Sequence, residues 1–177
     1  DMLDTISDNA LKMKSYIDGI LEYSKYAKSE INFKNIDLIQ LINKEVKSMR
    51  YLYPDLEISI DCRLKEIYAD ELMMTQVITN LLDNAAKYRS LKLRPKLEIL
   101  TYEKDDSAYI VFRDNGIGIP DKMLKAVFDM YRRAVSDAEQ EGTGLGLSIV
   151  KSIVLRHEGS VEASHNKPVG TIIKIVI

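Results

Sequence analysis

One stretch of the sequence carries side chains suited to binding an anion together with a divalent cation. It reads QVITNLLDNAAKY over residues 76–88, and Asn80, Asn84 and Lys87 follow one another at steps of four and three. In a helix these three side chains share one face. An amide oxygen is a hard, neutral ligand for Mg²⁺, and a lysine ammonium can neutralise phosphate. An ordinary solvated face is the alternative, although two asparagines inside a helix need a reason.

Two glycine-rich stretches are the other candidates for ligand contact. DNGIGIP, residues 114–120, follows a predicted strand; its glycines allow close backbone approach to a flat ligand, and Asp114 can accept a hydrogen bond from an exocyclic amine. GTGLGLS, residues 142–148, opens a predicted helix, where a glycine-rich N-terminus suits an anion. A plain turn and a flexible hinge are the respective alternatives. The usual phosphate loop and the dinucleotide fingerprint are both missing.

Hydrophobic patterning predicts a mixed scaffold behind these motifs. Helices are expected over residues 37–53, 71–88 and 144–157, with Asp37 and Asp70 as N-caps. Strands are expected at 56–60, 67–68, 96–103, 108–113, 160–164 and 171–177. Residues 116–142 form a long irregular connection with one short helix near 122–128, and connections of this length are usually functional or mobile. The order of elements favours an α+β fold over a doubly wound one.

The first 29 residues predict a long helix that pairs with other helices. Their apolar residues recur at alternating steps of three and four, at Leu3, Ile6, Ala10, Met13, Ile17 and Ile20. The remaining faces are polar, which favours a narrow seam over a broad core-facing surface. Packing against its own domain is the alternative. A boundary is expected near residues 29–34.

Composition argues against several classes of function. A net charge of −2 gives no basic surface for nucleic acid, and no apolar run is long enough for a membrane span. The single cysteine, Cys62, excludes an internal disulfide and fits a reducing compartment. His157 and His165 lack metal-ligand spacing, so each is expected at a cap or on the surface. The acidic start at Asp1 reads as a cut inside a longer protein.

Taken in order, these motifs and the late pair Gly170-Thr171 resemble the ATP-binding domain of sensor histidine kinases. That family belongs to the gyrase, heat-shock chaperone, histidine kinase and mismatch-repair ATPase superfamily. The resemblance covers about residues 33–177 and implies a two-layer α/β sandwich, with a mixed, mostly antiparallel sheet covered by helices on one face. It also implies that residues 1–31 are the second helix of the dimerisation hairpin, and that 32–177 form the ATP-binding catalytic domain.

The resemblance further implies roles for individual residues. Asn84 matches the metal-binding asparagine, and Asp114 matches the aspartate that reads the adenine amino group. Asn80, Lys87 and Arg132 match positions on the phosphate side and are the candidate catalytic residues. The other matches around the nucleotide are Tyr88, Gly116, Gly118, Ile119, Tyr131, Gly142, Thr143, Gly144, Leu145, Gly146, Leu147 and Thr171. Residues 119–141 match the lid over the triphosphate.

One position separates the branches of the superfamily by chemistry. Hydrolysing members carry a glutamate one helical turn before the metal asparagine, and here that position is Asn80. An amide cannot act as a general base at neutral pH. The resemblance therefore implies phosphoryl transfer to a protein acceptor, with ATP and Mg²⁺ as cofactors.

The implied acceptor is a histidine on the first dimerisation helix, which this chain does not contain. The chain alone is thus expected to bind ATP without autophosphorylating. The implied partners are its own dimerisation helices in a homodimer and a response regulator, with no nucleic acid and no membrane contact. The implied location is cytoplasmic, within a full-length protein that can be membrane-anchored.

Two alternatives remain at this point. One is a serine or threonine protein kinase of the same superfamily, such as an anti-sigma factor or a mitochondrial dehydrogenase kinase. The other is a non-catalytic nucleotide-binding signalling scaffold, because Met130 and the pair Arg132-Arg133 depart from the commoner lid pattern.

Overall fold

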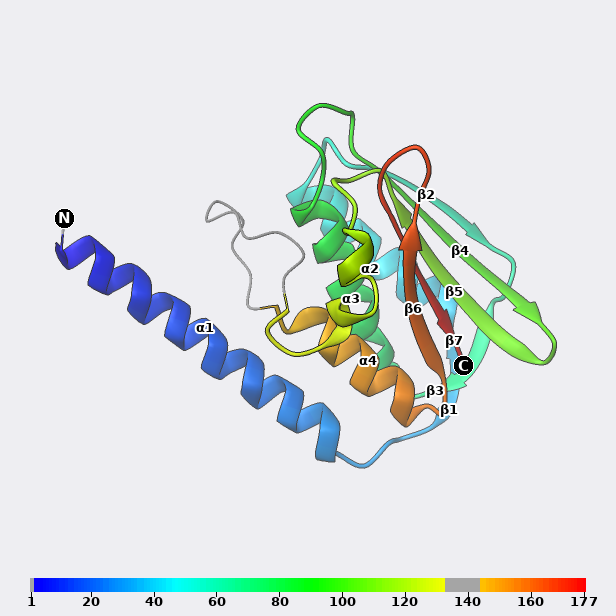
Figure 1. Ribbon diagram of the computed structural model, residues 1–177. Helices are drawn as coiled ribbons and strands as arrows, with labels where there is room; N and C mark the ends of the chain where they lie inside the picture. The colour runs from blue at the N-terminus through cyan, green and yellow to red at the C-terminus, as the bar shows by residue number, and fades with distance from the viewer. Residues whose placement is uncertain (1, 133–143) are drawn as a thin grey trace.

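The computed structural model describes residues 2–132 and 144–177. A long helix leads into a body of two layers, in which helices cover one face of a five-stranded sheet (Figure 1). The helices and strands are α1 (Met2–Lys28), β1 (Lys34–Asp37), α2 (Leu38–Leu52), β2 (Glu57–Cys62), β3 (Glu66–Ala69), α3 (Glu71–Lys87), β4 (Lys96–Lys104), β5 (Ser107–Asp114), η1 (Asp121–Met123), η2 (Ala126–Phe128), α4 (Gly146–Arg156), β6 (Ser160–His165) and β7 (Thr171–Val176). The expected fold class is confirmed.

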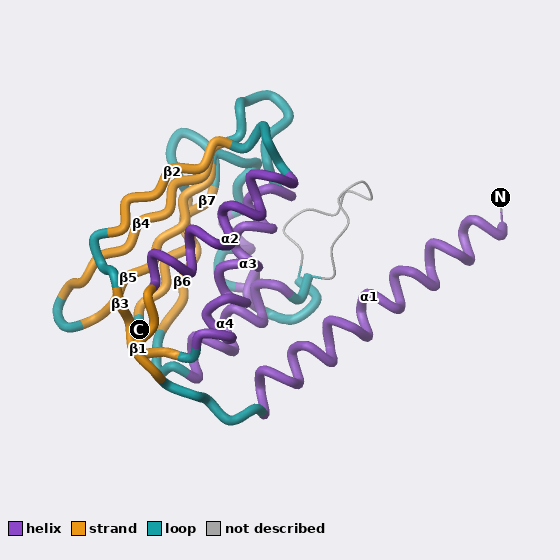
Figure 2. The backbone as a smooth tube through the Cα atoms, turned by 180° about the vertical axis from the view of Figure 1, so that it is seen from behind, coloured by secondary structure: helices purple, strands orange, loops and turns teal. Residues whose placement is uncertain are grey.

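The sheet runs in the order β2-β4-β5-β7-β6. β2 is parallel to β4, and the other neighbours are antiparallel, which gives the expected mixed and mostly antiparallel sheet. Its register places Ile99 opposite Phe112 and Phe112 opposite Ile173. All three side chains are buried, so one apolar row crosses the centre of the sheet beneath the helices. Seen from behind, the sheet and the helical layer lie face to face (Figure 2).

Helix α3 has one apolar stripe and one polar stripe. Its buried residues recur at helical spacing: Met73, Met74, Val77, Ile78, Leu81, Leu82, Ala85 and Ala86. Asn80 and Asn84 lie beside this stripe and are half-buried. Burial of the apolar stripe therefore fixes the direction in which the two amides point.

Both predicted N-caps are present. Asp37 Oδ1 accepts a hydrogen bond from the Gln40 N–H at 2.8 Å, and Asp70 Oδ1 accepts one from the Met73 N–H at 3.0 Å. Asp70 has a second partner, because its Oδ2 accepts a hydrogen bond from the Asn32 N–H at 2.8 Å. The cap of α3 thus also ties down the segment between α1 and β1.

Besides shifts of one or two residues at the ends of several elements, three differences between prediction and structure concern the site or its scaffold. No strand was predicted at residues 34–37, but they form β1, which pairs with β3 as a separate two-stranded sheet. The one short helix near 122–128 is two 3₁₀ turns, η1 and η2, and the second turn buries Val127 and Phe128. Helix α4 begins at Gly146 rather than at 144, since Gly144 has a φ of 70° and lies outside right-handed helical geometry.

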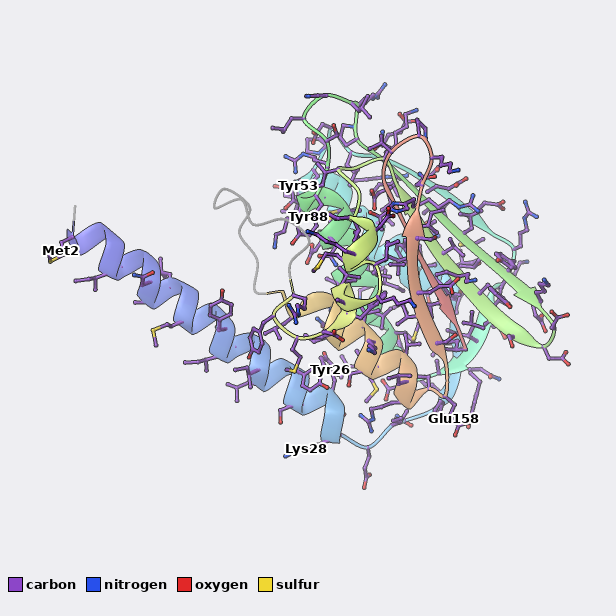
Figure 3. All side chains as sticks on the ribbon, in the orientation of Figure 1. Met2, Tyr26, Lys28, Tyr53, Tyr88 and Glu158 are labelled. Carbon is purple, nitrogen blue, oxygen red and sulfur yellow. The ribbon has the colours of Figure 1, made fainter. Side chains whose placement is uncertain are left out.

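Helix α1 is anchored to the body near its C-terminal end, and its first turns project away from the body (Figures 1 and 2). The buried Tyr26 hydroxyl donates a hydrogen bond to Gln76 Oε1 at 3.2 Å, and Arg156 donates to the carbonyl oxygens of Tyr26 and Ser29. Figure 3 shows Tyr26 at the end of α1 that lies beside the helical layer. Along the rest of the predicted seam, the described apolar side chains Ile6, Met13, Ile17 and Ile20 are exposed. Within the described residues, no helix has the combination of length and apolar character that a membrane crossing demands.

The two histidines take the places expected of them. His165 is exposed, and its Nε2 lies 2.5 Å from Asp121 Oδ1. His157 is the C-cap residue of α4 and is buried, with Nδ1 2.8 Å from the Ile153 carbonyl oxygen. Its Nε2 accepts a hydrogen bond from the Asp70 N–H at 3.1 Å, so the ends of α3 and α4 meet through this ring.

Asp70 is predicted to stabilise the fold more than Asp37 does. Both are N-caps, but Asp70→Ala also leaves the Asn32 N–H without its partner. We expect Asp70→Ala to lower the free energy of unfolding by roughly 2 kcal/mol and Asp37→Ala by about 1 kcal/mol. Urea unfolding followed by circular dichroism measures both. Equal losses would contradict the second role of Asp70.

The contribution of Asp70 is also predicted to depend on pH. Burial raises the pKa of Asp70, but hydrogen bonds from the Met73, Asn32 and Leu72 main chain and the nearby His157 outweigh burial, and the pKa falls below its ordinary value. Stabilisation by a carboxylate with a lowered pKa is present above the unfolded-state pKa of about 3.9 and is lost as pH falls below it.

The stability advantage of the wild type over Asp70→Asn should therefore be constant from pH 7 to about pH 5, and should shrink below about pH 4. Chemical unfolding at a series of pH values tests this expectation. A constant difference down to pH 2.5 would contradict it.

Candidate functional site

A pocket of about 180 Å³ opens between α3, the inner face of the sheet and the beginning of α4. It brings together side chains from segments that are far apart in the sequence. Among the residues predicted to bind a ligand, it is lined by Asn80, Asn84, Lys87, Tyr88, Asp114, Gly118, Ile119, Arg132, Gly144, Gly146, Leu147 and Thr171. The helix motif and both glycine-rich stretches thus converge on one cavity.

At one end of the pocket, the two asparagines lie against the first residue of α4. A Cβ built on Gly146 would lie 3.1 Å from Asn80 Oδ1 and 3.9 Å from Asn84 Nδ2. Among the described residues, the buried Nδ2 atoms of Asn80 and Asn84 have no hydrogen-bond partner. Buried amides are normally paired, so two unpaired ones side by side indicate a place for a polar ligand.

Two cationic side chains of the pocket favour an anionic ligand. Lys87 lies one turn after Asn84 on α3, and Arg132 lines the same pocket. The N-terminus of α4 adds main-chain N–H groups and the positive end of the helix dipole. An oxygen-rich anion with a divalent cation fits this combination of amides, cations and helix terminus.

At the other end, Asp114 is held in one orientation by main-chain groups. Its Oδ1 accepts hydrogen bonds from the Gly116 N–H at 2.8 Å and the Thr171 N–H at 3.1 Å. Both of these bonds reach Oδ1, and within residues 2–132 and 144–177 no protein donor reaches Oδ2. Burial raises the pKa of Asp114, and these two N–H groups partly offset that rise. A half-buried carboxylate with one free oxygen can accept a hydrogen bond from a ligand amine.

Gly116 acts through α3 rather than by lining the pocket. A Cβ at Gly116 would lie 2.3 Å from the Tyr88 carbonyl oxygen, a distance that no side chain allows. The same carbonyl accepts a hydrogen bond from the Ile117 N–H at 3.0 Å. The glycine-rich turn is therefore packed directly on the C-terminal end of α3, which aligns Asp114 with the asparagine face.

Four other predicted residues lie away from the pocket or outside the described residues. Leu145 is buried against α1, where a Cβ built on Gly19 would lie 2.3 Å from Leu145 Cδ1. The Tyr131 ring contacts the Tyr16 ring of α1 edge-on, with 6.0 Å between centroids. Gly142 and Thr143 lie outside the described residues, as do residues 133–141 of the predicted lid.

Sequence reasoning missed the apolar middle of the pocket. Its walls are Leu81, Leu97, Phe112, Val127 and Ile173. Leu97 and Ile173 occupy inward positions of β4 and β7, where burial alternates along the strand, whereas Phe112 lies in a continuous apolar run of β5. Asp83 also lines the pocket and was overlooked beside the asparagines.

Two asparagines that hold the Asp114 segment were missed as well. Asn115 Oδ1 accepts a hydrogen bond from the Lys96 N–H at 2.7 Å, and its Nδ2 donates to the Arg94 carbonyl at 2.9 Å. Asn166 Nδ2 donates to the Asp114 carbonyl at 2.8 Å. The sequence alone carries no signal for either contact, because each depends on strand pairing.

The arrangement suits a ligand with two chemically different ends. A flat apolar group with an exocyclic amine fits between the sheet walls and Asp114, and an anionic tail fits against the asparagines and α4. This is the shape and polarity of a purine nucleotide.

Comparison with known proteins agrees with this geometry. Residues 69–177 match the family model described as histidine kinase-, DNA gyrase B-, and HSP90-like ATPase. The sensor protein RprX of Bacteroides fragilis is 31% identical over 174 residues, which cover 94% of this chain and 34% of RprX. The chain thus spans about a third of the length of such curated relatives.

Solved structures show the same fold. The mycobacterial sensor histidine kinase MprB aligns with a TM-score of 0.74 and 30% identity, over 81% of this chain and 97% of that one. The histidine kinase ThkA, solved in complex with the response regulator TrrA, aligns with a TM-score of 0.76 and 20% identity, over 99% of this chain and 50% of that one. Given the family match over most of its globular part, the chain belongs to the histidine kinase-, DNA gyrase B-, and HSP90-like ATPase family.

Proposed function

We propose that this chain is the ATP-binding catalytic module of a sensor histidine kinase, which transfers the γ-phosphate of ATP to a histidine on a dimerisation helix. The observation that carries this proposal is the pocket with unpaired amides at one end and a half-buried aspartate at the other. Family membership supports ATP as the nucleotide. The sensor kinases among its relatives support the histidine acceptor.

In this proposal, Asn84 holds Mg²⁺ through its amide oxygen, and Asn80 and Lys87 contact the phosphates. The residues fit these groups, because the buried Nδ2 donors of both asparagines are unpaired beside a helix N-terminus and suit phosphate oxygens, and an amide oxygen is a hard ligand for Mg²⁺. Bound Mg²⁺ would neutralise charge on the phosphate oxygens. Gly144, Gly146 and Leu147 supply close main-chain approach to the phosphate tail.

At the other end, Asp114 accepts a hydrogen bond from the adenine amino group. Gly116 and Thr171 fix the orientation of its carboxylate, and Gly118 and Ile119 lie at the same part of the pocket. The apolar walls from β4, β5 and β7 exclude water from the base. Tyr88 lines the pocket at the end of α3.

Phosphoryl transfer demands positioning and charge neutralisation more than covalent chemistry from the protein. Lys87 and Arg132 provide positive charge, and we assign Arg132 to the γ-phosphate. Asn80 orients the phosphates but cannot remove a proton from water. Transfer to a protein nucleophile is therefore favoured over hydrolysis. Residues 133–143, including the proposed contacts Gly142 and Thr143, lie outside the described chain.

We propose the division into a partial dimerisation hairpin, residues 1–31, and a catalytic domain, residues 32–177. The exposed apolar seam of α1 supports homodimerisation through this helix. A structural relative in complex with a response regulator supports the same kind of partner here. We place the domain in the cytoplasm, where ATP and response regulators are found.

Nucleotide binding is predicted to depend on both ends of the pocket. Asn84→Ala should weaken Mg²⁺-ADP by at least about 10-fold and have a smaller effect on ADP in EDTA, because it removes a metal ligand. Asp114→Ala should weaken ADP by a similar factor with or without Mg²⁺. Isothermal titration calorimetry measures the affinity of each variant for ADP, once with Mg²⁺ and once in EDTA. Asn35→Ala, which removes an exposed asparagine, serves as a matched control. Unchanged affinity in both pocket variants would remove the site.

Transfer is predicted to require an added acceptor helix. The chain incubated with γ-labelled ATP and Mg²⁺ should gain no phosphate, whereas the chain joined to a dimerisation helix that carries the acceptor histidine should gain acid-labile, alkali-stable phosphate. Asn84→Ala in the joined protein should abolish this label. Acid-stable label would favour the serine or threonine kinase, and nucleotide binding without any label would favour a signalling scaffold.

A further inference from the structure

The connection between β6 and β7 wraps around the end of β5. Its first residue, Asn166, donates its side-chain Nδ2 to the Asp114 carbonyl at 2.8 Å. Its last residue, Gly170, and the first residue of β7, Thr171, contact the same aspartate from the other end of the connection. One residue of the pocket is thereby held at both its main chain and its side chain.

The Asn166 side chain is not required to close the connection. That closure is made by main-chain groups, since the Asn166 N–H donates to the Gly170 carbonyl at 3.1 Å. The side-chain amide instead reaches a carbonyl in another strand, 52 residues earlier in the sequence. Its contact with Asp114 is therefore additional to what a β-hairpin needs.

Close packing allows the β6–β7 connection only one position against Asp114. A Cβ on Gly170 would lie 2.0 Å from the Asp114 carbonyl oxygen, and Gly170 has a φ of 122°, which only glycine adopts readily. The connection thus lies directly on the Asp114 peptide. A shift of this connection would move the Thr171 N–H relative to Asp114 Oδ1, and with it the orientation of the free Oδ2.

We propose that Asn166 is a positioning residue for adenine recognition: it fixes the Asp114 carbonyl so that the carboxylate faces the 6-amino group of the purine. This inference rests on the proposed function, because it names Asp114 as the group that reads the base. Asn166 itself does not touch the nucleotide. It acts by preserving the geometry set by Thr171 and Gly116.

The test compares ADP with the diphosphate of purine riboside, which lacks the 6-amino group, by calorimetry. The wild type should prefer ADP, and Asn166→Ala should reduce this preference by roughly 3- to 10-fold, as expected for one misaligned hydrogen bond. In an Asp114→Ala background, Asn166→Ala should change the preference no further, because its effect passes through Asp114. Ser164→Ala, an exposed position in β6, is the control and should leave the preference unchanged.

Asn166→Asp provides a second variant of nearly the same shape that lacks the amide donor. It should reduce the preference as Asn166→Ala does, while thermal unfolding shows both variants to be folded. If both variants keep the wild-type preference, or weaken the two nucleotides by the same factor, the role of Asn166 is overturned. If the wild type does not bind ADP, the nucleotide site fails, and that result is distinguishable from failure of Asn166 alone.

Discussion

The buried amides of Asn80 and Asn84 constrain the rest of the structure. Leaving a buried hydrogen-bonding group unpaired costs about 1–3 kcal/mol, so two neighbouring unpaired amides are costly unless a ligand satisfies them. Their position follows from α3, whose neighbouring apolar stripe is buried in the core. Gly146 adds to the constraint, because a Cβ at the start of α4 would lie only 3.1 Å from Asn80 Oδ1 and would press on that amide. Stability of the folded chain and affinity for a polar ligand are therefore linked at this place.

The two ends of the pocket are aligned through one contact. The turn after β5 packs against the Tyr88 carbonyl. Asp114 is therefore positioned by α3, the helix that also carries the asparagines. Asp70 and His157 fix the opposite end of α3 and link it to α4 and to the segment after α1. The helix that carries the amides is thus held at both ends.

Local sequence signals predicted the parts of the fold that depend on local physics. The caps at Asp37 and Asp70, the α3 pattern and the strands β4 and β5 were all predicted, because capping and periodicity act over a few residues. The strand β1 was missed, since four residues gain their structure only by pairing with β3. The family resemblance located the polar residues of the pocket other than Asp83, but not the apolar walls that the strands provide. Those walls form only when β4, β5 and β7 are placed in register beneath α3.

Residues of one motif separate in space, and this separation has a physical reason. In GTGLGL, Gly144 and Gly146 line the pocket, whereas Leu145 is buried against Gly19 of α1. Successive side chains at the start of a helix point in different directions, so a single turn can contact a ligand and a neighbouring helix at once. Protein interiors are closely packed, and Leu145 has no free space on the α1 side. A displacement of α1 near Gly19 therefore changes the packing of the residue between the two glycines that line the pocket.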